Sequence, residues 1–431
     1  MIALDTTRCA YCGSCVSVCP VGALDLRETY LTITEECTEC GLCLSACPMG
    51  ALYRDVPQPK AGTLPIRDTY DLVVIGAGPA GSMAAWRGAS EGLSVLLVEK
   101  RQEIGSPVRC AEGVGHEPLA AFIEPDPHWI SAHIRRADIR ILDSGLEMTL
   151  EAPQPYGYVL ERRIFDRVLA ERAALAGAHV VVKTSAVGLL REGGAVRGVR
   201  LRSAWGERDV AATVVIGADG VESQVGHWAG LDTTLLARDL MSCAQFYLVG
   251  IDIDPECNYF FIGYEIAPGG YAWVFPKGEG CANVGLGVQC DLADRPALDY
   301  LTRFVESQPT LARGHPVTLI SGGVPVGLPP ADIVTDGCML VGDAAHQVDP
   351  FTGGGIINAM TAGQMAAQVA ARAVRQRDAS AAVLREYQEQ WEADLGRRMV
   401  RNYRMRERFP PTQRTDERFL RVFALTVGGG K

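Results

Sequence analysis

Eight of the fourteen cysteines lie within the first forty-seven residues, where they form two copies of one spacing. Each copy reads C-x2-C-x2-C-x3-C and is followed directly by proline, at Pro20 and at Pro48. Thiolates gathered in this way can hold metal ions or iron–sulfur clusters, or they can form disulfides. Disulfides and a pair of zinc sites are both disfavoured, because zinc sites typically combine two paired CxxC arms, whereas each run here is a triple closed by Cys-Pro.

The double run resembles the motif of bacterial two-cluster ferredoxins, in which the fourth cysteine of each run ligates the other cluster. This resemblance implies two [4Fe–4S] clusters and the transfer of single electrons. It also implies the ligands: Cys9, Cys12, Cys15 and Cys47 for one cluster, and Cys37, Cys40, Cys43 and Cys19 for the other.

A second pattern begins near residue 70, where an apolar strand expected at 72–75 leads into the glycine-rich turn GAGPAG at 76–81. A small-residue helix follows, and a second strand at 94–98 ends at Glu99. Glycines at these positions allow a tight turn and let the backbone approach a pyrophosphate, which the helix N-terminus attracts. Glu99 lies at the offset where an acidic side chain accepts a ribose hydroxyl. The segment is therefore predicted to bind a dinucleotide.

Two later segments, TVVIGADG at 213–220 and MLVGDAAHQVDPFTGGGIINAM at 339–360, distinguish FAD from NAD. Together with the first turn and the segment YVLERRIFD at 158–166, they resemble the FAD domain of aromatic-hydroxylase-type flavoproteins. Either segment alone would also suit an ordinary strand-to-turn junction. The resemblance implies FAD contacts from Gly76, Gly78, Ala80, Gly81, Glu99, Lys100, Arg109, Cys110, Arg162, Val187, Asp219, Gly342, Asp343, Gly353, Gly354, Gly355 and Ile356.

The segment 243–288 has short, alternating aromatic stretches typical of an antiparallel sheet. Tyr271, Trp273 and Phe275 alternate and so project from one face of a strand, where a plain sheet core is one interpretation. However, PGGYAWVFPKG followed by NVGLG resembles the substrate-domain signature of the geranylgeranyl reductase family. The loop EIGSPVRCAEGVG at 103–115 resembles that family's cysteine loop beside the flavin. The resemblance implies that Cys110, Tyr271 and Trp273 form the catalytic site.

A buried structural thiol is the alternative for Cys110. The other cysteines have no ligand spacing and are interpreted as core residues: Cys243, Cys257, Cys281, Cys290 and Cys338.

The predicted fold is α/β: a doubly wound FAD domain with an inserted antiparallel substrate sheet, preceded by a small α+β ferredoxin-like domain. The predicted ranges are 1–55 for the ferredoxin-like domain, 56–66 for a Pro-rich linker, 67–235 and 331–375 for the FAD domain, 236–330 for the substrate sheet and 376–431 for a helical tail.

The composition indicates where the protein is located and which partners it can bind. The sequence contains no stretch of eighteen apolar residues, so no transmembrane helix is expected. The cysteine motif begins so close to the first residue that no signal peptide is expected. A cysteine-rich chain of this kind is expected in the reducing cytoplasm. The net charge of −10 argues against nucleic acid as a partner. Residues 397–421, with nine arginines against three acids, are either a solvated helix face or a peripheral contact with the inner face of a membrane.

These patterns predict an FAD-dependent reductase that saturates C=C bonds of polyprenyl chains on an isoprenoid lipid. Since a second dinucleotide turn is lacking, electrons are expected from reduced ferredoxin or another one-electron donor, through the two clusters. An electron carrier to quinone, like electron-transfer-flavoprotein:quinone oxidoreductases, is the alternative. A flavin hydroxylase is disfavoured, because O2 chemistry beside such clusters would damage them. An ether lipid, a menaquinone tail, a chlorophyll-type alcohol and a free diphosphate all remain open as the prenylated substrate.

Overall fold

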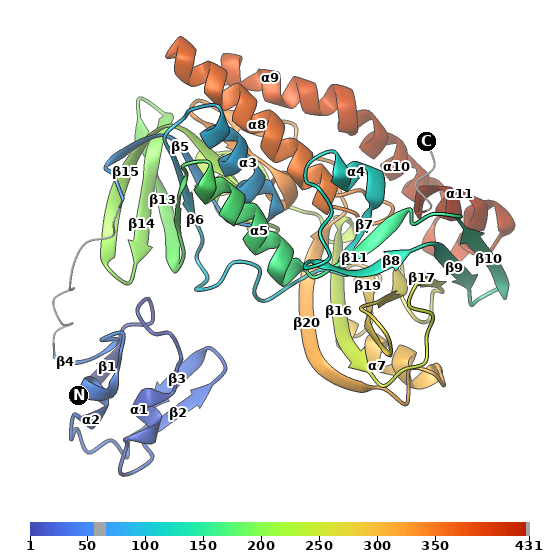
Figure 1. Ribbon diagram of the computed structural model, residues 1–431, viewed down its shortest axis with the longest axis horizontal. Coiled ribbons are helices and arrows are strands. Elements are labelled where there is room, and N and C mark those ends of the chain that lie inside the picture. The colour runs from blue at the N-terminus through green and yellow to red at the C-terminus, as the bar shows by residue number, and fades with distance from the viewer. Residues whose placement is uncertain (56–65, 428–431) are drawn as a thin grey trace.

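The computed structural model describes residues 1–55 and 66–427 (Figure 1). The first range is a separate α+β unit. Its elements are β1 (Ile2–Leu4) paired with β4 (Leu52–Arg54), β2 (Leu24–Arg27) paired with β3 (Tyr30–Ile33), and the short helices α1 (Ser14–Ser17) and α2 (Leu42–Ala46). The linker predicted at 56–66 lies outside the described residues, apart from Ile66, which is buried in the core of the next domain.

The predicted FAD domain is built on a sheet with the strand order β12-β6-β5-β15-β14-β13. The strands β12, β6, β5 and β15 run parallel, and their runs Leu72–Ile75 and Val95–Val98 are wholly buried, as expected for strands covered on both faces. A short strand, β22, extends the parallel part beside β15 and pairs with β21. The bounds are β5 (Thr69–Ile75), β6 (Val95–Val98), β12 (His179–Val181), β13 (Thr184–Glu192), β14 (Ala195–Ser203), β15 (Gly206–Gly217), β21 (Val334–Thr335) and β22 (Cys338–Leu340).

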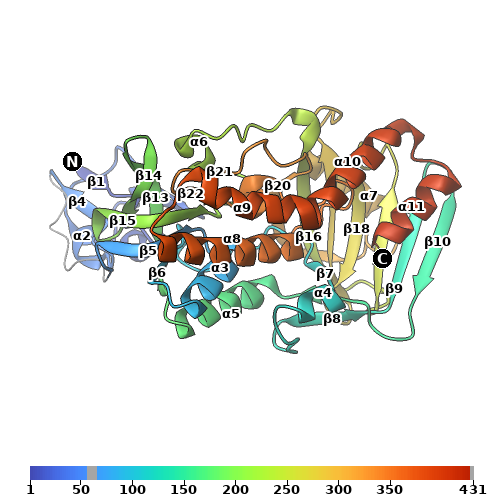
Figure 2. The same ribbon diagram turned by 90° about the horizontal axis from the view of Figure 1, so that it is seen from above.

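Three helices pack against one another along this sheet: α3 (Pro79–Ser90), α5 (Arg162–Leu175) and α8 (Ile356–Gln376) (Figures 1 and 2). The close packing of α3 on α8 depends on small residues, since a Cβ at Gly363 would collide with the backbone of Ala80. Smaller elements complete this half: α4 (His116–Ala120), α6 (Val225–Ala229), η1 (Ala237–Asp239), η2 (Gly342–Ala345) and a three-stranded sheet of β7 (Gly113–Gly115), β8 (Ile130–Ile134) and β11 (Gly157–Leu160).

The second large sheet has seven strands in the order β10-β9-β17-β18-β19-β16-β20. The side chains of its strand β18 alternate between the two faces of the sheet. Ala272 and Val274 face helix α7 (Ala297–Ser307), whereas Trp273 and Phe275 face the opposite side, toward the C-terminal helices. The remaining bounds are β16 (Leu240–Val249), β17 (Cys257–Ile262), β18 (Tyr271–Pro276), β19 (Cys281–Gln289) and β20 (His315–Pro325).

This sheet extends beyond the range 236–330 predicted for it. The hairpin of β9 (Arg136–Ile141) and β10 (Leu146–Glu151) comes from the range predicted for the FAD domain. Strand β9 pairs parallel with β17, so the sheet is mixed and not purely antiparallel. The sequence does indicate a strand here, because the apolar residues of β9 alternate, and these side chains are fully buried in the structure. Its parallel partner, β17, lies far along the chain, so the sequence pattern does not indicate the pairing.

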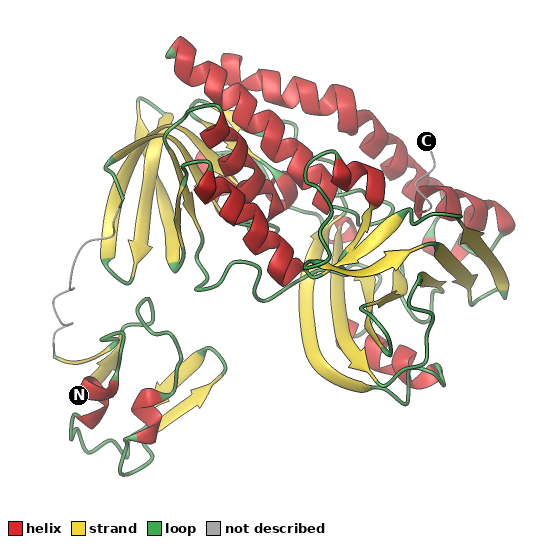
Figure 3. Cartoon of the chain, in the orientation of Figure 1, coloured by secondary structure: helices red, strands yellow, loops and turns green. Residues whose placement is uncertain are grey.

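The described part of the chain after α8, up to Val427, is mainly helical and runs back over both halves (Figure 3). Its elements are α9 (Ala381–Trp391), η3 (Glu392–Gly396), α10 (Arg397–Arg408), η4 (Pro411–Gln413) and α11 (Glu417–Val427), which packs on β9 and β10. The basic segment is not uniformly exposed: Arg406 and Arg414 are buried, whereas its other seven arginines face solvent. In the part of the chain that is described, no helix is both long and apolar enough to cross a membrane.

Candidate functional site

A cavity of about 1010 Å³, here called the central cavity, lies between the two large sheets. It brings together the predicted catalytic residues Cys110, Tyr271 and Trp273. It is also lined by nearly all of the predicted FAD residues: Gly76, Gly78, Ala80, Glu99, Lys100, Arg109, Arg162, Val187, Asp219, Gly342, Asp343, Gly353, Gly354, Gly355 and Ile356. Gly81 does not line the cavity and acts instead through packing.

The first glycine-rich turn has the shape that a dinucleotide requires. Gly76 has φ of 100°, and a Cβ there would collide with the carbonyl of Ala218. A Cβ at Gly81 would collide with the carbonyl of Gly76, so only glycine allows the helix to begin this close to the strand. Gly78 is the N-cap of α3, and a Cβ there would meet nothing within 4 Å. The helix N-terminus therefore opens onto free space that fits a pyrophosphate.

Glu99 ends β6 beside this turn. Its carboxylate accepts hydrogen bonds from the backbone N–H groups of Ala77 (3.0 Å) and Arg101 (2.9 Å), which fixes its orientation at the cavity wall. Each carboxylate oxygen can accept a further hydrogen bond, so the geometry fits a ribose hydroxyl. The carboxylate of Asp219, unlike that of Glu99, caps the N-terminus of α6. It accepts hydrogen bonds from the backbone N–H groups of Gln224 (2.8 Å) and Val225 (3.1 Å).

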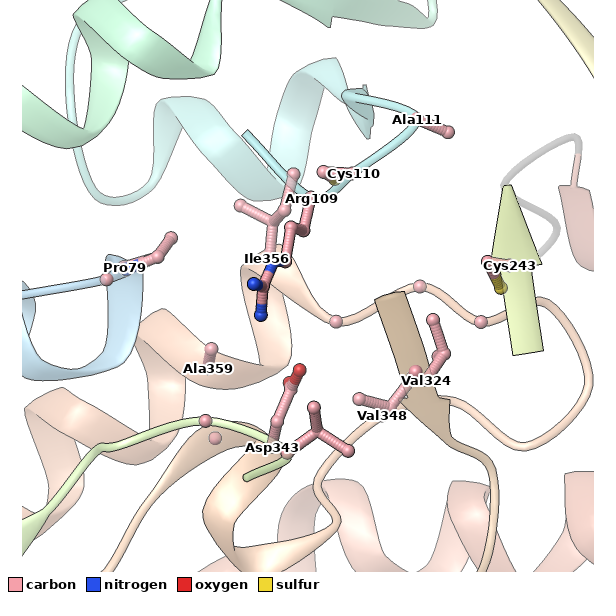
Figure 4. A pocket seen from close by; sticks show the side chains of 18 of the residues that line it. Pro79, Arg109, Cys110, Ala111, Cys243, Val324, Asp343, Val348, Ile356 and Ala359 are labelled. Atoms are coloured by element: carbon pink, nitrogen blue, oxygen red, sulfur yellow. The ribbon is translucent and has the colours of Figure 1, made fainter. Parts of the chain in front are cut away.

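The opposite wall is formed by η2 and by the start of α8. Figure 4 shows the carboxylate of Asp343 and the guanidinium of Arg109 pointing into the same space. Burial raises the pKa of Asp343, and the nearby Arg162 guanidinium offsets part of that rise. The backbone of Gly353–Gly355 lies at the N-terminus of α8 without side chains to obstruct it. This wall therefore fits the ribityl chain and the ring system of a flavin.

Cys110 lies on the loop before β7, and its side chain is half-buried at the cavity. Its sulfur accepts a hydrogen bond from the backbone N–H of Glu112 at 3.2 Å. Burial raises the pKa of the Cys110 thiol, and Arg162 partly opposes this rise. The guanidinium of Arg162 is itself held by two hydrogen bonds to the carboxylate of Asp166, at 2.8 and 2.7 Å. The thiol is therefore neutral at neutral pH.

The alternating aromatic residues of β18 connect the catalytic loop to the C-terminal helices. The Tyr271 hydroxyl donates to the carbonyl of Thr352 (2.5 Å), immediately before the glycines at the start of α8. The Tyr271 ring also meets the ring of Phe423 on α11 at 5.5 Å between centroids. Tyr271 thus lies between the predicted flavin loop and the helical end of the cavity.

In the N-terminal unit, the eight cysteines surround two small cavities. One is lined by Cys9, Cys12, Cys15 and Cys47, and the other by Cys19, Cys37, Cys40 and Cys43. Each set combines three thiols of one run with the last thiol of the other. These are the two sets that the ferredoxin resemblance implies, and thiols are the donors that iron–sulfur clusters use.

Comparison with known families gives three matches along the chain. Residues 8–51 match the 4Fe-4S dicluster domain, residues 71–254 match the FAD dependent oxidoreductase family, and residues 239–324 match the geranylgeranyl reductase catalytic domain. A protein of Methanosphaerula palustris named digeranylgeranylglycerophospholipid reductase is 51% identical over 80% of this chain and 87% of its own length. The chain belongs to the geranylgeranyl reductase family.

Other comparisons agree with this assignment. The Methanosarcina acetivorans protein of the same name is 52% identical over 77% of this chain and 82% of its own length. The crystal structure of a geranylgeranyl bacteriochlorophyll reductase-like protein from Thermoplasma acidophilum superposes with a TM-score of 0.77, at 42% identity over 79% of this chain and 87% of that one. A p-nitrophenol 4-monooxygenase from Pseudomonas putida, at 18% identity and a TM-score of 0.66, shares the fold alone. The reductase is therefore an FAD-dependent oxidoreductase with iron–sulfur clusters, as predicted.

The catalytic loop of the reductase is held by a buried carboxylate that sequence reasoning missed. Glu112 has φ of 74° and is 5% exposed. Its Oε2 accepts from Nζ of Lys277 (2.7 Å) and from Nδ2 of Asn283 (2.6 Å). Its Oε1 accepts from the backbone N–H of Arg162 (2.7 Å). Two motif residues of the substrate sheet thereby fix the loop two residues after Cys110.

A second connection runs through Gln245 on β16. Its amide nitrogen donates to the carbonyl of Cys110 (3.1 Å), and its amide oxygen accepts from Nε1 of Trp273 (2.8 Å). Trp273 therefore both lines the cavity and helps to orient the loop. Cys243, predicted as a core residue, also lines the cavity, and burial raises its pKa to about 12. Cys257 and Cys338 are buried as predicted, while Cys281 and Cys290 are half-buried.

Proposed function

We propose that this reductase saturates the carbon–carbon double bonds of geranylgeranyl chains carried by a glycerophospholipid. The observation that carries the proposal is the aromatic wall of the central cavity, where Tyr271, Trp273 and Phe423 line the same space as Cys110. A wall of this kind buries an extended apolar chain beside the expected flavin. The names of the relatives from Methanosphaerula palustris and Methanosarcina acetivorans support the glycerophospholipid as the carrier.

The protein's own groups have defined tasks in this reaction. Gly76, Gly78, Glu99 and Asp343 would hold FAD, which when bound supplies the hydride for one alkene carbon. An isolated alkene has no carbonyl to stabilise negative charge, so a proton must reach the other carbon in the same step or before it. The hydroxyl hydrogen of Tyr271 is already donated to the carbonyl of Thr352. We therefore assign the role of proton donor to Sγ of Cys110, which burial keeps protonated.

The iron–sulfur unit supplies electrons, and we propose that the two sets of four cysteines are the ligands of its two clusters. Reduced ferredoxin or a similar one-electron donor would reduce them. The set with Cys9 is the one we propose as the donor to the flavin. Nζ of Lys183 donates to the carbonyl of Cys9 at 2.7 Å and lies 5.9 Å from the ring centroid of Tyr11. Lys183 directly precedes Thr184, which lines the central cavity.

The direct test uses the anaerobically purified holoprotein, dithionite and a digeranylgeranylglycerophospholipid. We expect lipid masses that rise in steps of two hydrogens, one step for each double bond, as measured by mass spectrometry. A quinone analogue in place of the lipid tests the alternative. Rapid quinone reduction with an unchanged lipid would favour the electron carrier and contradict the reductase proposal.

We further propose that the protein contacts an anionic membrane surface through α10. Five arginines of this helix face solvent: Arg397, Arg398, Arg401, Arg404 and Arg408. Co-sedimentation with vesicles of anionic phospholipid should weaken as salt is raised, because the screening length falls from about 10 Å at 0.1 M to about 3 Å at 1 M. Vesicles of neutral phospholipid serve as the control. Binding that is equally strong at both salt concentrations would contradict the proposal.

A further inference from the structure

Two arginines of the basic segment lie at the wall of the central cavity, not on the surface. Arg406, in the last turn of α10, is 9% exposed, and Arg414, just after η4, is 8% exposed. Both line the cavity together with Phe419 and Phe423. A guanidinium inside an apolar cavity is costly unless something compensates its charge.

The compensation within the protein is incomplete. Arg406 donates to Oε1 of Gln289 (3.0 Å) and to the carbonyls of Val326 (2.9 Å) and Arg238, and it pairs with Asp239 at 3.6 Å. Arg414 donates only to carbonyl oxygens, from Nε to Phe409 (3.0 Å) and from Nη1 to Gly269 (2.8 Å).

No Asp or Glu among the described residues lies within ion-pair distance of Arg414, and none of them accepts a hydrogen bond from its Nη2. Burial lowers the pKa of Arg414 to about 10, with a contribution from the charge of Arg406, so the Arg414 guanidinium is charged at neutral pH. Asp239 pairs with Arg406 and not with Arg414, so among the described residues the Arg414 guanidinium has no carboxylate partner at this end of the cavity.

A continuous apolar path joins this charge to the predicted flavin loop. The guanidinium of Arg414 lies 5.7 Å from the ring of Phe419, whose centroid is 6.0 Å from that of Phe423. Phe423 meets Tyr271 at 5.5 Å, and Tyr271 bonds to Thr352 beside the glycines of α8. A ligand that is anionic at one end and apolar along its length matches this arrangement.

We propose that Arg414, supported by Arg406, binds the phosphate group of the prenyl lipid while the chain extends along Phe419, Phe423 and Tyr271 toward Cys110. This inference rests on the proposed function and adds the position of the headgroup. Phosphate suits the site because a guanidinium can give it two parallel charge-assisted hydrogen bonds.

The test compares two substrates of the holoenzyme that differ only in the phosphate group, geranylgeranyl phosphate and geranylgeraniol. Arg414→Gln should raise KM for the phosphate about tenfold to hundredfold, as expected for a lost charge-assisted contact, and leave kcat nearly unchanged. KM for the alcohol should stay within about twofold of wild type. For the phosphate, the KM of Arg414→Lys should lie between those of wild type and Arg414→Gln. Arg313→Gln, at an exposed arginine outside the basic segment, should match wild type.

Binding to the oxidised holoprotein gives a second readout. Dodecyl phosphate should bind wild type more tightly than dodecanol, by tryptophan fluorescence, and Arg414→Gln should remove the difference. Inorganic phosphate should not compete, because it has no chain to bury; competition as strong as that of dodecyl phosphate would overturn the assignment to a lipid headgroup. If Arg414→Gln and Arg414→Lys both raise KM equally for the phosphate and the alcohol, Arg414 has only a structural role. Failure of wild type to reduce the digeranylgeranylglycerophospholipid with dithionite would instead contradict the proposed function.

Discussion

Lys277→Met is expected to lower the free energy of unfolding by about 3–5 kcal/mol, because it leaves the buried carboxylate of Glu112 without its cation. Lys277 and Glu112 are 3% and 5% exposed, and their charged atoms lie 2.7 Å apart. Methionine preserves most of the apolar stem, so the loss reports on charge and not on volume. Urea denaturation of the holoprotein, followed by circular dichroism, measures the change.

Arg200→Met is the control at an exposed ion pair. Arg200 pairs with Asp209 at 2.7 Å, but these side chains are 51% and 48% exposed, so the expected cost is only a small fraction of that of Lys277→Met. Adding Glu112→Gln to Lys277→Met should recover part of the loss, because the unpaired charge is removed. Similar costs for Lys277→Met and Arg200→Met would show that the Lys277–Glu112 pair contributes no more than a surface pair and would weaken the assigned role of Glu112 in positioning Cys110.

Deletion of residues 1–55 is expected to lower turnover with reduced ferredoxin by about 100-fold or more, since tethering keeps the clusters at high effective concentration beside the flavin. Turnover with dithionite should persist, because this small reductant can reach the flavin directly and residues 66–427 have their own core. The measurement is lipid reduction by the full-length and the truncated protein, each with both donors.

Two further results decide the role of the clusters. The excised unit added in trans should restore turnover only near millimolar concentration. Cys290→Ser, at a half-buried thiol outside both cysteine sets, should leave ferredoxin-driven turnover intact. If the truncated protein works equally well with both donors, or if NADPH alone drives the full enzyme, the clusters are not the route by which electrons arrive.

Local spacing explains which parts of the site could be predicted. The turn at Gly76 and the acid at Glu99 belong to one strand–helix–strand unit, so their roles follow from a few neighbouring residues. The cysteine runs are equally local. By contrast, Glu112 receives its hydrogen bonds from residues 50, 165 and 171 positions away, and no short pattern encodes that meeting. The buried state of Arg414 depends in the same way on Gly269, 145 positions before it.

The mixed sheet limits how this protein can be recombined. Its strands come from two separate stretches, with β9 and β10 before β12 to β15 of the FAD half and β16 to β20 after them. A chimera that exchanged residues 236–330 alone would set a foreign β17 against a native β9 along six residue pairs. The two halves must therefore be inherited, engineered and unfolded together, whereas the contiguous cluster unit in front of them can be gained or lost in one fusion event.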